Sequence, residues 1–263
     1  MFLRISVLIL LCYFSIGAEE EYFVVFLVNA RGLDYTNSLN FLKTVAKHPR
    51  DRSKNGDVGH AWIYLKGEEI LEGGHSGERG EFQPCYMEGV LENWVLGATN
   101  PVSYLWCAQS DGFFQQGNGG HSPTFAAKAI LTKTQYESIK LLIKTYPFHN
   151  YSLTGSQCCT FVKEVAKLAG IKWEDQVTLQ IEPTIKLQGK IVRLWQNHKY
   201  RFLTFASPDK LEMSLKQLVK EGKLIDALKW YQDTHQKCLK CRLKNSVEKL
   251  INFPKRFFRY VLL

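Results

Sequence analysis

Apolar runs separated by glycine-rich turns dominate the first half of the chain. The run at 22–28, rich in valine and phenylalanine, has the length and composition of a buried strand. Further strand-like runs follow at 58–65, 69–72, 91–96, 102–107 and 125–131. Glycine-rich stretches between them, such as Gly73–Gly77 and Gly117–His121, indicate turns. The pattern predicts a sheet built from several short strands.

Two later segments have the 3.6-residue periodicity of amphipathic helices. One begins at Thr132 or Thr134 and runs to Thr145. The other covers 156–169, where apolar residues recur at i, i+4, i+7 and i+8, and Gly170 suits its end. We expect the apolar stripe of this second helix to hold its first turn against a core.

The first residues have the pattern of an export signal. Arg4 precedes an apolar run at 5–16, and small residues follow before three consecutive glutamates. The run is shorter than the roughly 18 apolar residues that a membrane-spanning helix needs. We therefore predict a signal peptide at 1–18 and an exported protein, located in the periplasm or outside the cell.

Positive charge is concentrated near the C-terminal end. Residues 185–263 carry 18 Lys and Arg against 6 Asp and Glu, a net charge of +12, whereas the 263-residue chain carries +9. The pattern also changes after Pro183, with helical periodicity returning at 208–235. We predict one domain at 19–183 and a basic, mainly helical extension at 184–263. An anionic polymer or a membrane surface would suit this extension, and no nucleic acid is expected as a partner.

Two adjacent cysteines, Cys158 and Cys159, stand where a loop turns into the second helix. The free N–H groups and the dipole at a helix start stabilise a thiolate, which is the reactive form of cysteine. Neighbouring helical positions diverge by about 100°, so both thiols cannot point into one cleft. Either one is a nucleophile and the other packs, or both pack as small apolar residues.

Outside this pair, the cysteines and histidines do not form a metal-binding pattern. Cys238 and Cys241 make a single Cys-x-x-Cys, without the second pair that a four-cysteine zinc site needs. We expect no metal and no cofactor. A histidine, His60, opens the strand-like run that ends at Leu65. A thiol and a distant histidine brought together by folding are the arrangement of a cysteine hydrolase or acyltransferase.

The stretch Gln157-Cys158-Cys-Thr-Phe161-Val162 resembles the Asp-Cys-Ser-Gly-Phe-Val and Asn-Cys-x-x-Phe-Val signatures of the NlpC-type papain-like superfamily. The nucleophile of that superfamily stands three residues before the Phe, which selects Cys158. His60 precedes the cysteine, as in the circularly permuted branch that includes lecithin retinol acyltransferase-like and YiiX-like proteins. The resemblance covers roughly 56–170. It departs from the family at Gln157, where Asp or Asn is common, and in the second cysteine.

The resemblance implies an α+β fold with a papain-like, circularly permuted core, in which an antiparallel sheet packs on the nucleophile helix. It also implies a third polar catalytic residue on the strand after His60. Glu72 stands twelve residues later, and His75 is the alternative, because the retinol acyltransferase group has a histidine there. Strand alternation favours Glu72, and the glycines around His75 indicate a loop.

The expected roles follow from cysteine-hydrolase chemistry. His60 would take the thiol proton and later protonate the leaving group. Glu72 would accept the other ring N–H of His60 and so fix its tautomer. The backbone N–H of Cys158, helped by the side chain of Gln157, would stabilise the oxyanion.

Two further residues are candidates for substrate binding: His121 in its glycine-rich loop, and Tyr151 before the nucleophile helix. We expect a thiol-dependent hydrolase or acyltransferase that cleaves an amide or ester bond through a Cys158 thioester. Its substrates would be cell-wall peptides or lipid amides, with an amidase or peptidase activity. The alternative is a non-catalytic binding module on the same fold that acts through its basic C-terminal segment.

Overall fold

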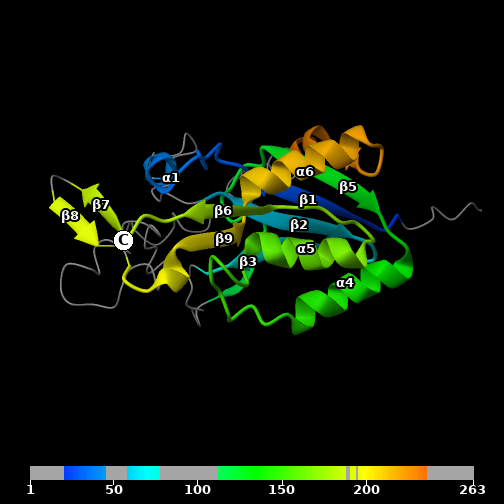
Figure 1. The fold of residues 1–263 in the computed structure, drawn as a ribbon. Helices are drawn as coiled ribbons and strands as arrows, with labels where there is room; N and C mark the ends of the chain where they lie inside the picture. Colours follow the sequence, from blue (N-terminus) through cyan, green and yellow to red (C-terminus); the bar gives the residue numbers. More distant parts are fainter. Residues whose placement is uncertain (1–20, 46–57, 78–111, 188–189, 194, 236–263) are drawn as a thin grey trace, which may run out of the picture.

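A six-stranded antiparallel sheet forms the centre of the computed structural model, which describes residues 21–45, 58–77, 112–187, 190–193 and 195–235 (Figure 1). Its strand order is β10-β5-β1-β2-β3-β4. These strands are β1 (Phe23–Asn29), β2 (His60–Lys66), β3 (Ile70–Ser76), β4 (Phe113–Gln116), β5 (Phe125–Ile130) and β10 (Ile225–Asp226). The predicted α+β class and antiparallel sheet are confirmed.

Three helices cover one face of this sheet: α4 (Lys133–Thr145), α5 (Cys158–Leu168) and α6 (Pro208–Lys220). Their apolar stripes meet alternate residues of β1 and β2 in the main core, as the predicted periodicity of the first two helices requires. Thr132 caps α4 by accepting the N–H of Gln135, and Gln135 bonds back to the N–H of Thr132. The helix bearing the two cysteines is thus packed directly on the sheet.

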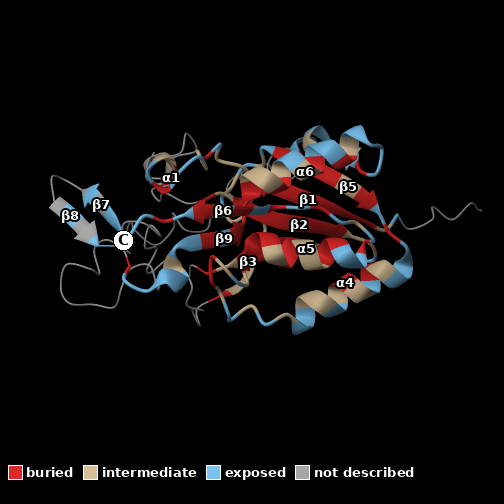
Figure 2. Cartoon of the chain, in the orientation of Figure 1, coloured by how far each residue is buried: buried red, intermediate tan, exposed pale blue. Residues whose placement is uncertain are grey.

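The opposite face of the sheet is covered by residues 227–235, most of them helical. Ala227 and Tyr231 pack there against the other alternate residues of β1 and β2, including Trp62 and Tyr64. All seven residues of β1 are therefore buried. Figure 2 shows the central strands as the most continuously buried part of the molecule. A continuous apolar run, rather than an alternating one, is the expected pattern for such a strand.

Two small antiparallel sheets and the short helix α1 (Ser38–Val45) extend from one end of the main sheet (Figure 1). One pairs β6 (Gln176–Gln180) with β9 (Phe202–Ala206), and the other pairs β7 (Thr184–Leu187) with β8 (Lys190–Arg193). A 3-10 turn, η1 (His198–Tyr200), precedes β9. A second apolar cluster joins the β6–β9 pair to α1 through residues such as Phe41 and Phe205.

The structure differs from the predicted division at residue 183. Beyond it, β9 pairs with β6, β10 pairs with β5, and α6 packs in the main core. The described part of 184–235 is therefore built into the fold rather than forming a separate, mainly helical extension. Residues 236–263, the predicted signal peptide at 1–18 and the strands predicted at 91–96 and 102–107 lie outside the described residues. Within the described residues, the structure contains no helix with the length and apolar character needed to span a bilayer.

The glycines at 73 and 74 also differ from their predicted role, since they lie within β3 and not in a turn. A Cβ on Gly73 would lie 2.4 Å from the carbonyl oxygen of Gln115, and one on Gly74 would lie 2.7 Å from that of Ala61. Glycine is thus required by the close approach of neighbouring strands. As a consequence, His75 lies on a strand and not in a loop.

Candidate active site

Gln157 caps the helix that carries the two thiols. Its side-chain oxygen accepts the N–H of Cys159 at 2.8 Å and faces the sulfur of Cys158 at 3.2 Å. Its amide nitrogen donates to the carbonyl oxygen of Ala206 at 2.6 Å, which ties the helix start to β9. The geometry therefore gives Gln157 a capping role, and it does not support the predicted contribution to an oxyanion site. The amide nitrogen is engaged with Ala206.

The two thiols are both free and buried, but their surroundings differ. A hydrogen bond with Cys159, followed by the hydrogen bond and the charge of His60, lowers the pKa of Cys158 well below its usual value, although burial acts in the opposite direction. Burial raises the pKa of Cys159 well above its usual value. The opposite directions favour a thiolate at Cys158 over one at Cys159, with Cys159 as its hydrogen-bond partner. This distinction agrees with the thiol that the Phe161 spacing selects.

His60 begins β2 and is 7% exposed. Two other rings lie nearly parallel to its imidazole. The ring of His121 is 4.8 Å away at 26°, and that of Trp62 is 5.8 Å away at 16°, measured between centroids. The Nε2 atom of His60 is buried and has no hydrogen-bond partner among the described residues. The hydrogen bond with Cys158 and the neighbouring rings thus hold this imidazole, and Nε2 makes no bond to the described residues.

Glu72 is not brought to His60. The register of the β2–β3 hairpin pairs Glu72 with Tyr64, four residues beyond His60 along β2. At about 3.3 Å per residue, this separates the two positions by about 13 Å along the sheet. Instead, the carboxylate of Glu72 accepts from the indole N–H of Trp62 at 3.3 Å and from the hydroxyl of Tyr231 at 2.5 Å. The hydrogen bond that we predicted from His60 to Glu72 is therefore absent.

Gly74 occupies the β3 position next to the imidazole of His60. A Cβ built on Gly74 would lie 3.2 Å from the Nε2 atom of His60. The place from which a third residue could bond to this nitrogen therefore has no side chain. Backbone crowding at Gly74, described above, explains why glycine stands there.

His75 is fully buried on the face of the sheet that carries α5. Its Nε2 atom lies 2.8 Å from the carbonyl oxygen of Phe148. Because a carbonyl oxygen can only accept, the proton is on Nε2, and Nδ1 has a free lone pair. Nδ1 has no hydrogen-bond partner among the described residues. Burial lowers the pKa of His75, while the nearby charges of Cys158 and His60 act in opposite directions. His75 is thus a buried imidazole whose pKa is lowered by burial, against the opposing effect of its bond to the carbonyl oxygen of Phe148.

The two predicted substrate-binding residues both lie beside these histidines. His121 is half-buried and stacks on His60. Tyr151 meets the ring of His75 edge-on, with centroids 5.1 Å apart at 87°. The structure thus brings His121 and Tyr151 to the candidate site, and their contact with a substrate stays a prediction. Among the described residues, no cluster of three His, Cys, Asp or Glu side chains could hold a metal ion.

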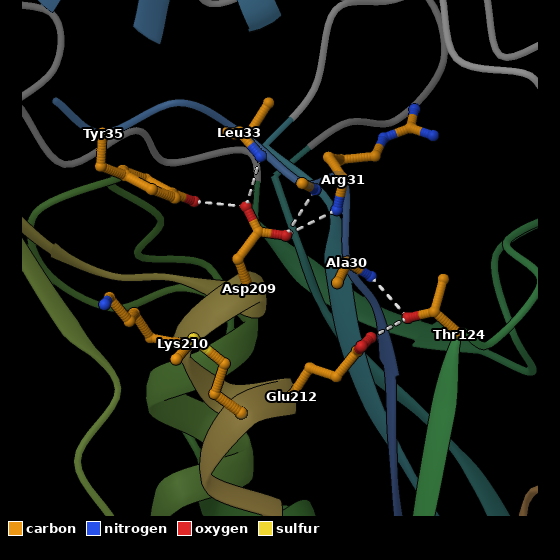
Figure 3. Close-up of a pocket in the computed structure, with 10 residues that line it drawn as sticks. Ala30, Arg31, Leu33, Tyr35, Thr124, Asp209, Lys210 and Glu212 are labelled. Atoms are coloured by element: carbon orange, nitrogen blue, oxygen red, sulfur yellow. Dashed lines mark hydrogen bonds between the residues drawn. The ribbon is translucent and has the colours of Figure 1, made fainter. Parts of the chain in front are cut away.

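Asp209, in the first turn of α6, organises the loop that follows β1 (Figure 3). Its carboxylate accepts the backbone N–H groups of Arg31, Gly32 and Leu33 at 2.7, 2.8 and 2.9 Å. It also accepts the hydroxyl of Tyr35 at 2.7 Å. Burial and this carboxylate raise the pKa of Tyr35. Asp209 was not predicted from the sequence, although its place directly after Pro208 is a helix-start signal.

A cavity of about 480 Å³ opens beside Asp209, between the loop at 30–33 and the first part of α6 (Figure 3). One of its lining residues, Ala30, directly follows β1. The last residue of β1, Asn29, pairs with His60 at the start of β2. Thr124 also lines it, three residues after His121 in the chain. The side chains of Cys158, His60, His75 and His121 do not line this cavity.

Comparison with known proteins adds nothing to this geometry. No protein-family model, no curated protein sequence and no solved structure matches the chain.

Proposed function

We propose that the protein is a thiol-dependent acyl-transfer enzyme in which Cys158 is the nucleophile and His60 is its proton acceptor. The observation that carries this proposal is the meeting of two residues far apart in the sequence. The pKa of the thiol that begins α5 is lowered by a hydrogen bond with Cys159 and then by the hydrogen bond and the charge of His60, the imidazole that opens β2. A thiolate at a helix start beside an imidazole is the activated form of a cysteine nucleophile.

The reaction follows from this pair. The thiolate of Cys158 attacks the carbonyl carbon of an amide or ester, and the resulting oxyanion lies near the N-terminal N–H groups of α5. The bond to the leaving amine or alcohol then breaks as protonated His60 gives it a proton, which leaves a thioester on Cys158. Water or another acceptor gives a proton to His60, attacks the thioester carbonyl, and regenerates the thiolate.

The catalytic group contains a thiol and two histidines in this proposal, and Glu72 is not part of it. His75 contributes a free Nδ1 lone pair near the thiol, which can accept a hydrogen bond from a substrate N–H or from the attacking water. A Cys–His–His group is also what the resemblance to the retinol acyltransferase group implies. The proposed family is therefore the circularly permuted, NlpC-type papain-like branch.

Amide bonds in cell-wall peptides or lipid amides are the proposed substrates, with amidase or peptidase activity. The cavity beside Asp209 is of the size that ligand-binding sites have, and it would hold the part of the substrate beyond the scissile bond. The ring of His121 stacks on that of His60. His121 would therefore contact the substrate close to the scissile bond.

The test is selective alkylation with iodoacetamide, followed by peptide mapping of Cys158 and Cys159. We expect Cys158 to react at least about tenfold faster at pH 7, because its pKa is lowered and that of Cys159 is raised. The rate at Cys158 should fall only under acidic conditions, as its thiolate takes up a proton. Because the hydrogen bond with Cys159 is the largest cause of the shift at Cys158 and His60 comes after it, His60→Ala should reduce the difference, whereas His198→Ala, in the exposed η1 turn, should leave it unchanged.

Equal and slow labelling of both thiols would refute the proposal. In that case the non-catalytic binding module, acting through the basic C-terminal segment, would be the better interpretation.

A further inference from the structure

The hairpin formed by β7 and β8 presents an apolar side chain beside two cations. Its register pairs Lys186 with Ile191 and Thr184 with Arg193. Cross-strand partners, and residues two apart along one strand, lie on the same face of a sheet. These four side chains therefore share one face, and all four are exposed. Ile191, which is 78% exposed, lies next to both cations on that face.

Two more cations lie at the base of this hairpin. The backbone N–H of Ile181, three residues before β7, donates to the carbonyl oxygen of Arg201 at 2.7 Å. Lys199 and Arg201 are both exposed. The guanidinium of Arg201 lies over the ring of Phe202, which is itself 51% exposed. The base thus repeats the combination of cations with an exposed apolar side chain.

Carboxylates do not balance the positive charge of this region. Residues 182–202 include five Lys and Arg against a single acidic residue, Glu182, a net charge of +4. Lysines on the helices of the main sheet pair with carboxylates, as Lys140 does with Glu69. Within the described residues, no ion pair is formed by the exposed cations of the hairpin and its base, which are Lys186, Arg193, Lys199 and Arg201.

The hairpin projects from one end of the molecule. Figure 1 shows β7 and β8 at the end away from α4, α5 and α6. Its base is packed: the indole N–H of Trp195, two residues after β8, donates to the carbonyl oxygen of Ile181 at 2.9 Å, and both residues belong to the second apolar cluster. The described side chains beyond this base are exposed and can meet a broad, flat partner.

We propose that the β7–β8 hairpin docks on the surface of an anionic lipid bilayer. Lys and Arg side chains near such a surface are attracted to its acidic headgroups. An apolar side chain among them enters the boundary between headgroups and acyl chains, where it leaves water. A soluble polyanion would satisfy the cations but offers nothing to Ile191. The combination of unpaired cations with an exposed apolar residue on one face therefore favours a bilayer.

The test is co-sedimentation of the full chain with lipid vesicles at neutral pH. Vesicles of phosphatidylcholine alone are compared with vesicles in which about a third of the lipid is anionic phosphatidylglycerol. We expect binding to the anionic vesicles to be at least about tenfold tighter, and to weaken as salt is raised, because salt screens exposed charges. Equal binding to the two kinds of vesicle, or binding that does not change with salt, would overturn the proposal.

Substitutions assign the binding to the hairpin, because residues 236–263 are also rich in Lys and Arg. The double variant Lys186→Gln, Arg193→Gln should bind the anionic vesicles about thirtyfold more weakly, as expected for two lost charges at the surface. Its matched control is Lys144→Gln, Lys220→Gln, which removes the same charge from exposed positions on α4 and α6. The control should change binding by less than about twofold, because these charges are screened from the bilayer. Equal losses in the two double variants would mean that net charge alone decides binding, and would refute docking through the hairpin.

Ile191→Ser distinguishes a bilayer from a soluble polyanion. It should weaken binding to the anionic vesicles about fivefold, because less apolar surface leaves water, and it should leave binding to heparin unchanged. If Ile191→Ser has no effect on vesicle binding, or if the wild type binds heparin more tightly than the vesicles, the partner is a soluble polyanion and the proposal is wrong. None of these measurements involves the reactivity of Cys158, so they are independent of the proposed function.

Discussion

Replacing Asp209 with alanine should destabilise the protein by about 3 kcal/mol. The carboxylate is the shared acceptor of three consecutive backbone N–H groups, at 31–33, and of the hydroxyl of Tyr35. Hydrogen bonds to a charged group contribute about 1.5–3 kcal/mol each when buried. These donors are partly exposed and regain water when the carboxylate is removed, so we take about 1 kcal/mol or less for each of the four.

Asp209→Asn should cost less, about 2 kcal/mol, because an amide keeps one oxygen for two of the donors but turns its own N–H groups toward the others. Asp233→Ala is the matched control, since Asp233 is an exposed acidic residue in the C-terminal helical segment. It should change stability by less than about 0.5 kcal/mol.

Urea unfolding followed by circular dichroism measures these differences at pH 7. The slope of the unfolding free energy against urea concentration should be the same in all variants, which checks that unfolding is two-state. For a chain of this size, the alanine variant should also melt about 6–12 °C lower. A loss below about 1 kcal/mol for Asp209→Ala, or a loss no larger than that of Asp233→Ala, would show that the loop does not depend on this carboxylate.

Two further substitutions test the packing around α5 and β3. Gly74→Ala should lower the free energy of unfolding by about 1–3 kcal/mol, because its Cβ would lie 2.7 Å from the carbonyl oxygen of Ala61. Urea unfolding measures this loss, and an unchanged urea midpoint would mean that β3 can move away from β2 without penalty. Lys163→Met should lower the free energy of unfolding by about 2–3 kcal/mol. The substitution removes the cation that lies 2.9 Å from the fully buried carboxylate of Asp175, which then keeps only the indole N–H of Trp173 as a side-chain partner. An unchanged thermal midpoint would contradict this account of the ion pair.

Local signals in the sequence were sufficient to place the thiol and the histidine. The apolar stripe of the 156–169 segment predicts the helix, and the spacing to Phe161 selects Cys158 over its neighbour. The run after His60 predicts the strand. Each of these signals depends on residues within one or two turns of the feature itself, so little long-range information was needed. The selection of Cys158 agrees with the opposite pKa shifts of the two thiols.

Glu72 shows why the third residue was harder to predict. Alternation along β3 favoured Glu72, but Glu72 lies on the same face as Trp62, opposite the face that carries α5. Alternation does not give the register, which is set by the tight turn between β2 and β3 and pairs Glu72 with Tyr64. The same turn places Gly74, and not Glu72, beside His60.

The partners of β9 and β10 in the fold were not predicted, for a different reason. The strands β9 and β10 span only five and two residues, and their partners lie far away in the sequence. Segments this short carry almost no periodicity of their own, so their pairing is decided by the rest of the fold. The basic composition of this region describes its surface and says nothing of which sheet it joins.

The two residues of β10 affect the edge of the main sheet. They pair with β5, which would otherwise be the outermost strand on that side. An uncovered strand of this kind offers its free N–H and C=O groups to any passing extended peptide, including another copy of itself. Through β10 and the N–H of Ala227, the same chain occupies part of this edge, which leaves fewer free groups for edge-to-edge self-association.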